Sequence, residues 1–160
     1  MTGLLHSPGF LGTNANFAAD MTLTLSLLVV TLFSIGYYLA RHGNYDVHKW
    51  VQTSGVLLNV VLVLWLMLLP YRSFILRDEG GPREMIFYQV TMLHAAVGLF
   101  AFFLGSFVVL RGHKLVPQFL RFKNYKLFMR TAYALYLTTT ALGVALYYTW
   151  YVVLSSPPTF

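Results

Sequence analysis

The segment "TMLHAAVGLFAFFLGSFVVL", Thr91–Leu110, decides the fold class of this chain. It contains no Asp, Glu, Lys or Arg, and it matches the roughly 20 residues that a helix needs to cross the hydrocarbon core of a bilayer. Three further stretches of similar or greater length are also free of charge: Met21–Ala40, Trp50–Tyr71 and Thr131–Phe160. The sequence therefore predicts four membrane-spanning helices.

The composition supports this prediction. Of the 160 residues, 58% are hydrophobic and only 10% are charged, whereas a soluble domain carries about 25% charged residues. The apolar runs lack the alternation of a barrel wall, whose strands need only about ten residues each. The chain has no cysteine, which excludes disulfides and thiolate metal sites. We therefore expect an all-α integral membrane four-helix bundle.

We expect one membrane domain that covers residues 1–160. Asp20 stands where a carboxylate would cap the first span, because acidic groups are favourable at helix N-termini. The expected spans are residues 20–41, 48–71, 85–111 and 128–154, with an interfacial segment at 1–19 and a basic cytoplasmic loop at 112–127.

Basic residues predict the orientation, because they resist translocation and stay in the cytoplasm. Eight of them flank the first and third connections and three lie in the second. The first and third connections should be cytoplasmic and both termini non-cytoplasmic, in a multi-pass protein of the bacterial inner membrane. The eight are Arg41, Lys49, Arg111, Lys114, Arg121, Lys123, Lys126 and Arg130, and the three are Arg72, Arg77 and Arg83.

The basic loop allows two interpretations. It could flank a span and rest on anionic lipid headgroups, at about 1 kcal/mol per basic residue, or it could dock an acidic partner. Nucleic-acid binding is not expected, because the cations lie at a membrane edge without a recognition module. The residues expected to contact lipid or a partner are Arg111, Lys114, Arg121, Lys123, Lys126 and Arg130.

Polar and small residues form two stripes at helical spacing. Polar groups are costly in lipid, so both stripes should face inward, where small residues allow close helix approach or leave room for a flat ligand. The stripe of the second span consists of His48, Gln52, Gly55 and Asn59, and that of the third span consists of Thr91, His94, Gly98, Ala101 and Gly105.

His94 is the histidine that lies deep within a predicted span. It is roughly 14 Å below the outer end of the third span, level with Asn59 at roughly 16 Å in the second. Two interpretations stay open: a neutral imidazole that is hydrogen-bonded to Asn59 or a threonine, or a metal ligand. His48 lies about 20 Å from His94 along the membrane normal. The two cannot share one haem iron, whose axial nitrogens are about 4 Å apart.

No catalytic residue is predicted. The chain has no "HExxH" helix, no glycine-rich phosphate loop and no paired carboxylates within a span. Its acidic residues lie in loops or at span edges, which also argues against an ion-coupled transporter. We therefore expect a protein that is not an enzyme.

The order of the motifs resembles a known family. "DVHKW" surrounds His48, "LHAAVGLFAFFLG" contains His94, and "KNYKLFMRTAYALY" and "TTTALGVALYYTWYV" form the fourth span. Together with "GFLGT" and "AADMTLTLSLL" near the N-terminus, they make nearly the whole chain similar to the bacterial membrane family catalogued as domain of unknown function 420. Where that family tends to have a histidine before the fourth span, this chain has Asn124. An amide is a poor iron ligand, which weakens a cytoplasmic-side haem site.

The resemblance implies work in respiratory membranes, assembly of haem–copper oxidases, and b-type haem bound through His48 and His94, with His94 as an iron ligand. We accordingly expect an accessory or assembly subunit of a respiratory or photosynthetic electron-transfer complex, in contact with the bilayer and with partner subunits. Haem b is the implied cofactor, and no other is expected. Two alternatives stay open: a cofactor-free structural subunit that packs against partner helices, lipid or pigment, and a free-standing b-type cytochrome.

Overall fold

The computed structural model describes residues 6–68, 72, 85–121 and 123–153. Within these residues the chain is helical apart from turns and loops, and no strand occurs there beyond an isolated bridge between Pro8 and Asn16. This confirms the predicted all-α class. The four long helices are α2 (Phe17–Arg41), α3 (Tyr45–Val61), α5 (Met85–Gly112) and α6 (Tyr125–Tyr148).

Two of these helices end in a wider π-helical turn. Helix α3 continues into η1 (Leu62–Met67), and α6 continues into η4 (Thr149–Val153). Such turns are rare and frequently occur at functional sites. Both lie on the end of their helix that is closer to the start of α2, and both line the cavity described below.

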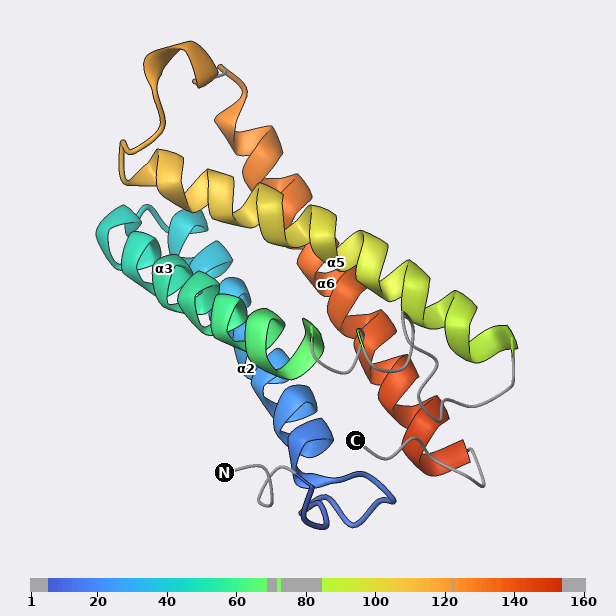
Figure 1. Cartoon of the computed structure of the whole chain (residues 1–160). Coiled ribbons are helices and arrows are strands. Elements are labelled where there is room, and N and C mark those ends of the chain that lie inside the picture. The colour runs from blue at the N-terminus through green and yellow to red at the C-terminus, as the bar shows by residue number, and fades with distance from the viewer. Residues whose placement is uncertain (1–5, 69–71, 73–84, 122, 154–160) are drawn as a thin grey trace.

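The helices form two antiparallel hairpins, α2 with α3 and α5 with α6 (Figure 1). Gly43, at φ +78°, provides the left-handed backbone of the α2–α3 turn. The longer α5–α6 connection contains the 3₁₀ helix η3 (Gln118–Leu120). That turn and that connection lie at one end of the molecule, here called the His48 end. Helix α2 begins and α6 ends at the opposite end, here called the Asp20 end.

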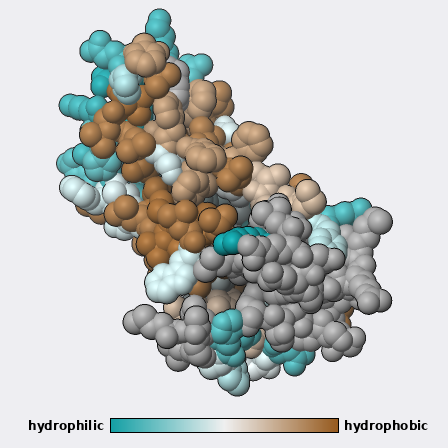
Figure 2. Space-filling view, viewed as in Figure 1, coloured by the Kyte–Doolittle hydropathy of each residue, from teal (hydrophilic) through white to brown (hydrophobic). Residues whose placement is uncertain are grey.

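Three stretches are long and apolar enough to cross a membrane: Phe17–Arg41, Tyr45–Met67 and Tyr88–Gly112. Figure 2 shows hydrophobic surface over the middle of the molecule and hydrophilic residues at the His48 end. These features are those of a membrane protein. Helix α6 is not among the three, because threonines such as Thr138–Thr140 and several tyrosines lower its hydropathy.

All four helices contribute to the central core. Its buried residues are Val29 and Phe33 of α2, Val56 of α3, Ala101 of α5 and Tyr136 of α6. The rings of Phe33 and Tyr136 are 4.4 Å apart between centroids. Ala101 belongs to the predicted stripe of the third span, and it is completely buried. The prediction that this stripe faces inward is correct at this position.

The start of α2 differs from the prediction. The N-cap is Asn16, whose Oδ1 accepts a hydrogen bond from the Ala19 N–H at 2.9 Å. Asp20 is not the cap; it lies in the first turn and is completely buried. Its carboxylate accepts hydrogen bonds from residues distant in the sequence, so Asp20 stabilises tertiary contacts and not the end of the helix. The helix begins within the predicted interfacial segment, because the Asn16 side chain already satisfies the N-terminal backbone.

Candidate functional site: a cavity beside His94

His48 and Gln52 fasten α3 to the backbone of α2. The His48 Nδ1 donates a hydrogen bond to the Gly36 carbonyl at 2.7 Å, and the Gln52 Nε2 donates to the Phe33 carbonyl at 3.3 Å. Gly36 permits this approach, because a Cβ there would collide with the Gln52 amide. Gln52 therefore faces inward as predicted, and His48, half-buried, faces α2 and not α5.

Gly55 and Asn59 continue the same stripe. A Cβ at Gly55 would lie 2.6 Å from the Phe33 ring, so the glycine makes room for that ring. The Asn59 Nδ2 donates a hydrogen bond to the Tyr136 Oη at 3.2 Å. Asn59 therefore pairs with Tyr136 of α6, and the hydrogen bond to His94 that was one of the predicted alternatives does not occur among the described residues.

Helices α5 and α6 interlock through glycines. A Cβ at Gly98 would lie 3.2 Å from Thr139 Cγ2, and one at Gly105 would lie 2.6 Å from the Tyr136 ring. In the reverse sense, a Cβ at Gly143 of α6 would lie 3.1 Å from His94 Cε1. Each helix thus offers small residues where the other presents a side chain, and the stripe of α5 faces α6 as predicted.

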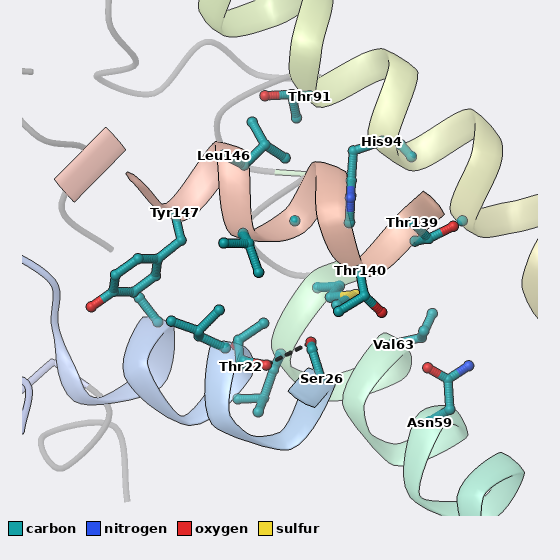
Figure 3. A pocket seen from close by; sticks show the side chains of 18 of the residues that line it. Thr22, Ser26, Asn59, Val63, Thr91, His94, Thr139, Thr140, Leu146 and Tyr147 are labelled. Atoms are coloured by element: carbon teal, nitrogen blue, oxygen red, sulfur yellow. Dashed lines mark hydrogen bonds between the residues drawn. The ribbon is translucent and has the colours of Figure 1, made fainter. Parts of the chain in front are cut away.

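The His94 imidazole lies across α6 at the turn that contains Thr139 and Gly143 (Figure 3). Its Nδ1–Cε1 edge faces Gly143, and the Thr139 backbone is a polar neighbour. Nδ1 is buried and has no hydrogen-bond partner within the described part of the chain.

A cavity of about 520 Å³ lies beside this imidazole, among all four helices. Ligand sites typically measure about 300–1,000 Å³ and are mostly apolar with a few polar groups. The lining is largely aliphatic and aromatic and includes no Lys, Arg, Asp or Glu among the described residues. Its polar groups include His94, Asn59, Thr139, Thr140 and Tyr151.

Three residues that line the cavity each carry a buried polar atom that has no hydrogen-bond partner within the described residues. These atoms are the His94 Nδ1, the Thr139 Oγ1 and the Tyr151 Oη. Tyr151 is only 3% exposed. Since the large majority of buried polar atoms are hydrogen-bonded, such exceptions are explained by an ordered water, an ion or a ligand.

The Asp20 end holds a polar cluster that the sequence did not reveal. The Asp20 carboxylate accepts hydrogen bonds from the Leu11 N–H at 2.7 Å and from the Tyr147 hydroxyl at 2.5 Å. The Tyr147 hydroxyl is also 2.6 Å from the Thr13 Oγ1. The four-residue spacing of Tyr147 and Tyr151, level with Asp20 in the predicted topology, was the signal that could have found this cluster.

The basic loop carries its cations on the surface. Arg121 donates hydrogen bonds to the carbonyls of Val116 at 3.0 Å and Lys114 at 3.3 Å. Within this loop Phe119 is 85% exposed. Lys114, Arg121, Lys123, Lys126 and Arg130 are exposed, whereas Arg111 is half-buried.

The Arg111 guanidinium lies 4.5 Å from the centre of the Tyr125 ring. The Tyr125 hydroxyl donates a hydrogen bond to the Val108 carbonyl at 3.2 Å. Burial raises the pKa of Tyr125, and the charge of Arg111 partly offsets that effect. The residue therefore stays a neutral hydrogen-bond donor that closes the α5–α6 hairpin.

The cavity is a poor match to a bis-histidine haem b. It offers the His94 imidazole, whereas His48 does not line it. Haem b also carries two carboxylates, which proteins usually pair with cations, and no Lys or Arg lines the cavity among the described residues.

Comparisons with protein-family models, with curated proteins and with solved structures found no match to this chain. The family resemblance therefore stays a prediction, and the function has to be inferred from the fold and the cavity.

Proposed function

We propose that the chain is a four-span accessory or assembly subunit of a membrane electron-transfer complex in the bacterial inner membrane. The Asp20 end would face away from the cytoplasm, because basic residues concentrate at the His48 end. Helices α2, α3 with η1, and α5 supply three of the spans.

Helix α6 is the proposed fourth span, and its polar groups are directed to the other helices. The Tyr133 hydroxyl is 3.0 Å from Ser34 Oγ, and the Tyr136 and Tyr147 hydroxyls pair with Asn59 and Asp20. Thr138 and Thr149 donate hydrogen bonds to their own helix backbone. Hydroxyls that are satisfied in this way reduce the cost of burying α6 in a bilayer.

The observation that carries the proposal is the position of His94 beside a cavity among the four helices. An ionisable side chain within a membrane span marks a functional site by default. The described residues of the lining include no Ser–His–Asp or Cys–His arrangement and no carboxylate base. A binding or accessory role agrees with this lining better than a hydrolytic reaction does.

The outer surface agrees with a subunit that contacts other helices. Phe100 is 74% exposed, and Phe103 and Trp65 are also largely exposed. Aromatic side chains are enriched in protein interfaces and at membrane–water boundaries. Partner helices or lipid would cover this surface in the membrane.

The alternative is a cofactor-free structural subunit, and one observation favours it over a haem carrier. Within the described part of the chain, the cavity supplies a single histidine and no Lys or Arg, so those residues offer neither a second imidazole nor partners for propionates. If haem does bind, His94 would hold the iron, and the haem would supply electron-transfer chemistry.

Purification in mild detergent tests the proposal. We expect the tagged chain to co-purify with subunits of a respiratory oxidase or a photosynthetic complex, and to be colourless when isolated. A Soret band that disappears in His94→Ala would instead establish a b-type cytochrome. A chain that co-purifies with no electron-transfer subunit would contradict the accessory role.

A further inference from the structure

The cavity occupies the half of the bundle that lies toward the Asp20 end (Figure 1). On α2 its lining runs from Ala18 to Val29, and on α5 it runs from Thr91 to Phe102. At about 1.5 Å per residue, each of these stretches corresponds to roughly 16 Å. The cavity therefore extends along the helices, and its length is close to that of one leaflet, which is half of the roughly 30 Å hydrocarbon core.

The two ends of the cavity differ. Val29, Asn59 and Tyr136 line the inner end, and both Val29 and Tyr136 belong to the buried core. Ala19 and Tyr151, which pack together in a second buried cluster, line the end beside the start of α2. The core thus bounds the cavity near the middle of the bundle, and the space runs from there toward one membrane surface.

The cavity also reaches the side of the bundle. Leu68, directly after η1, and Met92 and Leu99, on α5, line the cavity and remain more than half exposed. The three leucine and methionine side chains belong to or directly follow stretches that are apolar enough to cross a membrane. A molecule would therefore enter the cavity sideways from the hydrocarbon phase.

The polar side chains of the wall are used within the protein. The Thr22 hydroxyl donates a hydrogen bond to the Ala18 carbonyl at 2.7 Å, and the Ser26 hydroxyl donates to the Thr22 carbonyl at 2.7 Å (Figure 3). The Asn59 amide is paired with the Tyr136 hydroxyl. These residues consequently present mainly carbon atoms to the cavity.

The unpaired buried atoms of α5 and α6 do not reach the cavity either. His94 Nδ1 and Thr139 Oγ1 have no accessible surface, and they lie in the contact of the two helices over Gly143 and Gly98. The described lining also contains no Lys, Arg, Asp or Glu. A charged headgroup would therefore find no partner of opposite charge among these residues.

A cavity of about 520 Å³ has to be filled in the membrane. Protein interiors are close-packed and contain few voids larger than a water molecule. Water is a poor occupant, because each ordered water needs about two to four polar partners, and cavities with apolar walls stay dry and bind apolar molecules. The surrounding bilayer supplies such a molecule at high concentration.

We propose that one acyl chain of a membrane phospholipid fills this cavity. The glycerol end of the lipid lies at the Asp20 end, and the terminal methyl group lies near Val29 and Tyr136. Helices that cross a bilayer lie within about 20° of its normal on average, so the cavity has the direction and length of an acyl chain in that leaflet. The headgroup stays at the membrane surface while the chain enters between Leu68 and Met92.

The inference requires the membrane setting, and it goes beyond the proposed role in an electron-transfer complex. The bound chain acts as a structural lipid that completes the packing of the four helices. No chemical reaction is assigned to the cavity.

Two tryptophans report on different lipids. Trp150 lines the cavity, whereas Trp65 is exposed and is not part of the lining. Full-length chains that keep only one of the two, with the other tryptophans replaced by Phe, are reconstituted in phosphatidylcholine with a brominated acyl chain. They are then exchanged in detergent into an excess of unbrominated lipid. We expect the fluorescence of Trp65 to recover at once and that of Trp150 to stay quenched.

The position of the bromine tests the orientation of the lipid. Trp150 lies in η4 near the Asp20 end. Bromine near the glycerol end of the acyl chain should therefore quench Trp150 more than bromine near the terminal methyl group. The opposite order would overturn the proposal.

A pair of variants links the retained lipid to the cavity. Ala95→Leu places a larger side chain in the lining, whereas Ala141→Leu adds the same group at an exposed position outside it. Ala95→Leu should lose the persistent quenching of Trp150, and Ala141→Leu should keep it. Mass spectrometry should find one brominated lipid per chain in Ala141→Leu and none in Ala95→Leu, while circular dichroism shows both variants to be helical.

The inference is overturned if Trp65 and Trp150 recover together, or if the two leucine variants retain equal amounts of lipid. A different apolar molecule found at one per chain would overturn it as well.

Co-purification separates this inference from the proposed function. A chain that retains its lipid but associates with no electron-transfer complex would contradict the accessory role alone. A chain that co-purifies with such a complex but releases all lipid rapidly would overturn the lipid assignment alone.

Discussion

His94 of α5 packs the Nδ1–Cε1 edge of its ring against Gly143 of α6, where a Cβ would lie 3.1 Å from Cε1 and 3.6 Å from Nδ1. The contact fixes the spacing of the two helices at the level of the cavity.

Gly143→Ala should therefore push the ring away from α6. Overpacking of this kind costs about 1–3 kcal/mol, so we expect a lower midpoint of unfolding in detergent. Ala141→Val, at an exposed position of the same helix, should change the midpoint little. Equal stabilities of the two variants would show that α5 and α6 adjust freely at this level.

The hydrogen bond between Asn59 and Tyr136 connects the two hairpins through the core. A double-mutant cycle of Asn59→Leu and Tyr136→Phe should give a coupling energy of about 0.6 kcal/mol and below about 1.7 kcal/mol, as found for such pairs in membranes. Equilibrium unfolding in mixed micelles measures it. Pairing Asn59→Leu with Tyr133→Phe instead, which removes a hydroxyl that contacts Ser34, should give a coupling near zero.

Asp20→Asn should release the loop before α2. The carboxylate holds both the Leu11 N–H and the Tyr147 hydroxyl, and an amide oxygen can replace only part of that acceptor capacity. We expect exchange of the Leu11 amide hydrogen to accelerate about tenfold, because about 1.4 kcal/mol of protection would be lost. Hydrogen–deuterium exchange measures the change.

Asp46→Asn is the control for that experiment, since Asp46 is exposed in the first turn of α3. It should leave the exchange of residues 6–16 unchanged. Slow exchange at Leu11 in both variants would show that the loop is held by its backbone bonds, such as that from Phe17 N–H to Ser7 carbonyl.

The basic loop should insert its exposed aromatic residue into an anionic membrane surface. In nanodiscs, Phe119→Trp should give bluer fluorescence with anionic than with zwitterionic lipid. Replacing Lys114, Lys123 and Lys126 with Gln should remove the difference in fluorescence between the two lipids, because each basic residue contributes about 1 kcal/mol near an anionic surface. Added salt should weaken the effect. A spectrum that shifts only when an acidic partner protein binds would favour the docking interpretation instead.

The sequence predicted that the polar and small residues of α3 share one face of the helix, but it did not predict which residues they contact. The spacing of His48, Gln52, Gly55 and Asn59 is fixed by helix geometry, and Gln52, Gly55 and Asn59 do contact the other helices. The neighbours of that face depend on how the hairpins rotate against each other. Asn59 therefore meets Tyr136, and His94 meets Gly143, although the depths of Asn59 and His94 suggested a pair.

The sequence by itself determined that this chain is helical, apolar and built with inward-facing polar stripes, because charge-free length and helical periodicity are local properties of the chain. Only the tertiary structure decided that α6 buries its tyrosines against the other helices, that Asp20 binds Leu11 and Tyr147, and that a cavity opens beside His94. These features arise from contacts between segments far apart in the sequence, whose register is set by packing of large side chains onto glycines and not by any local pattern.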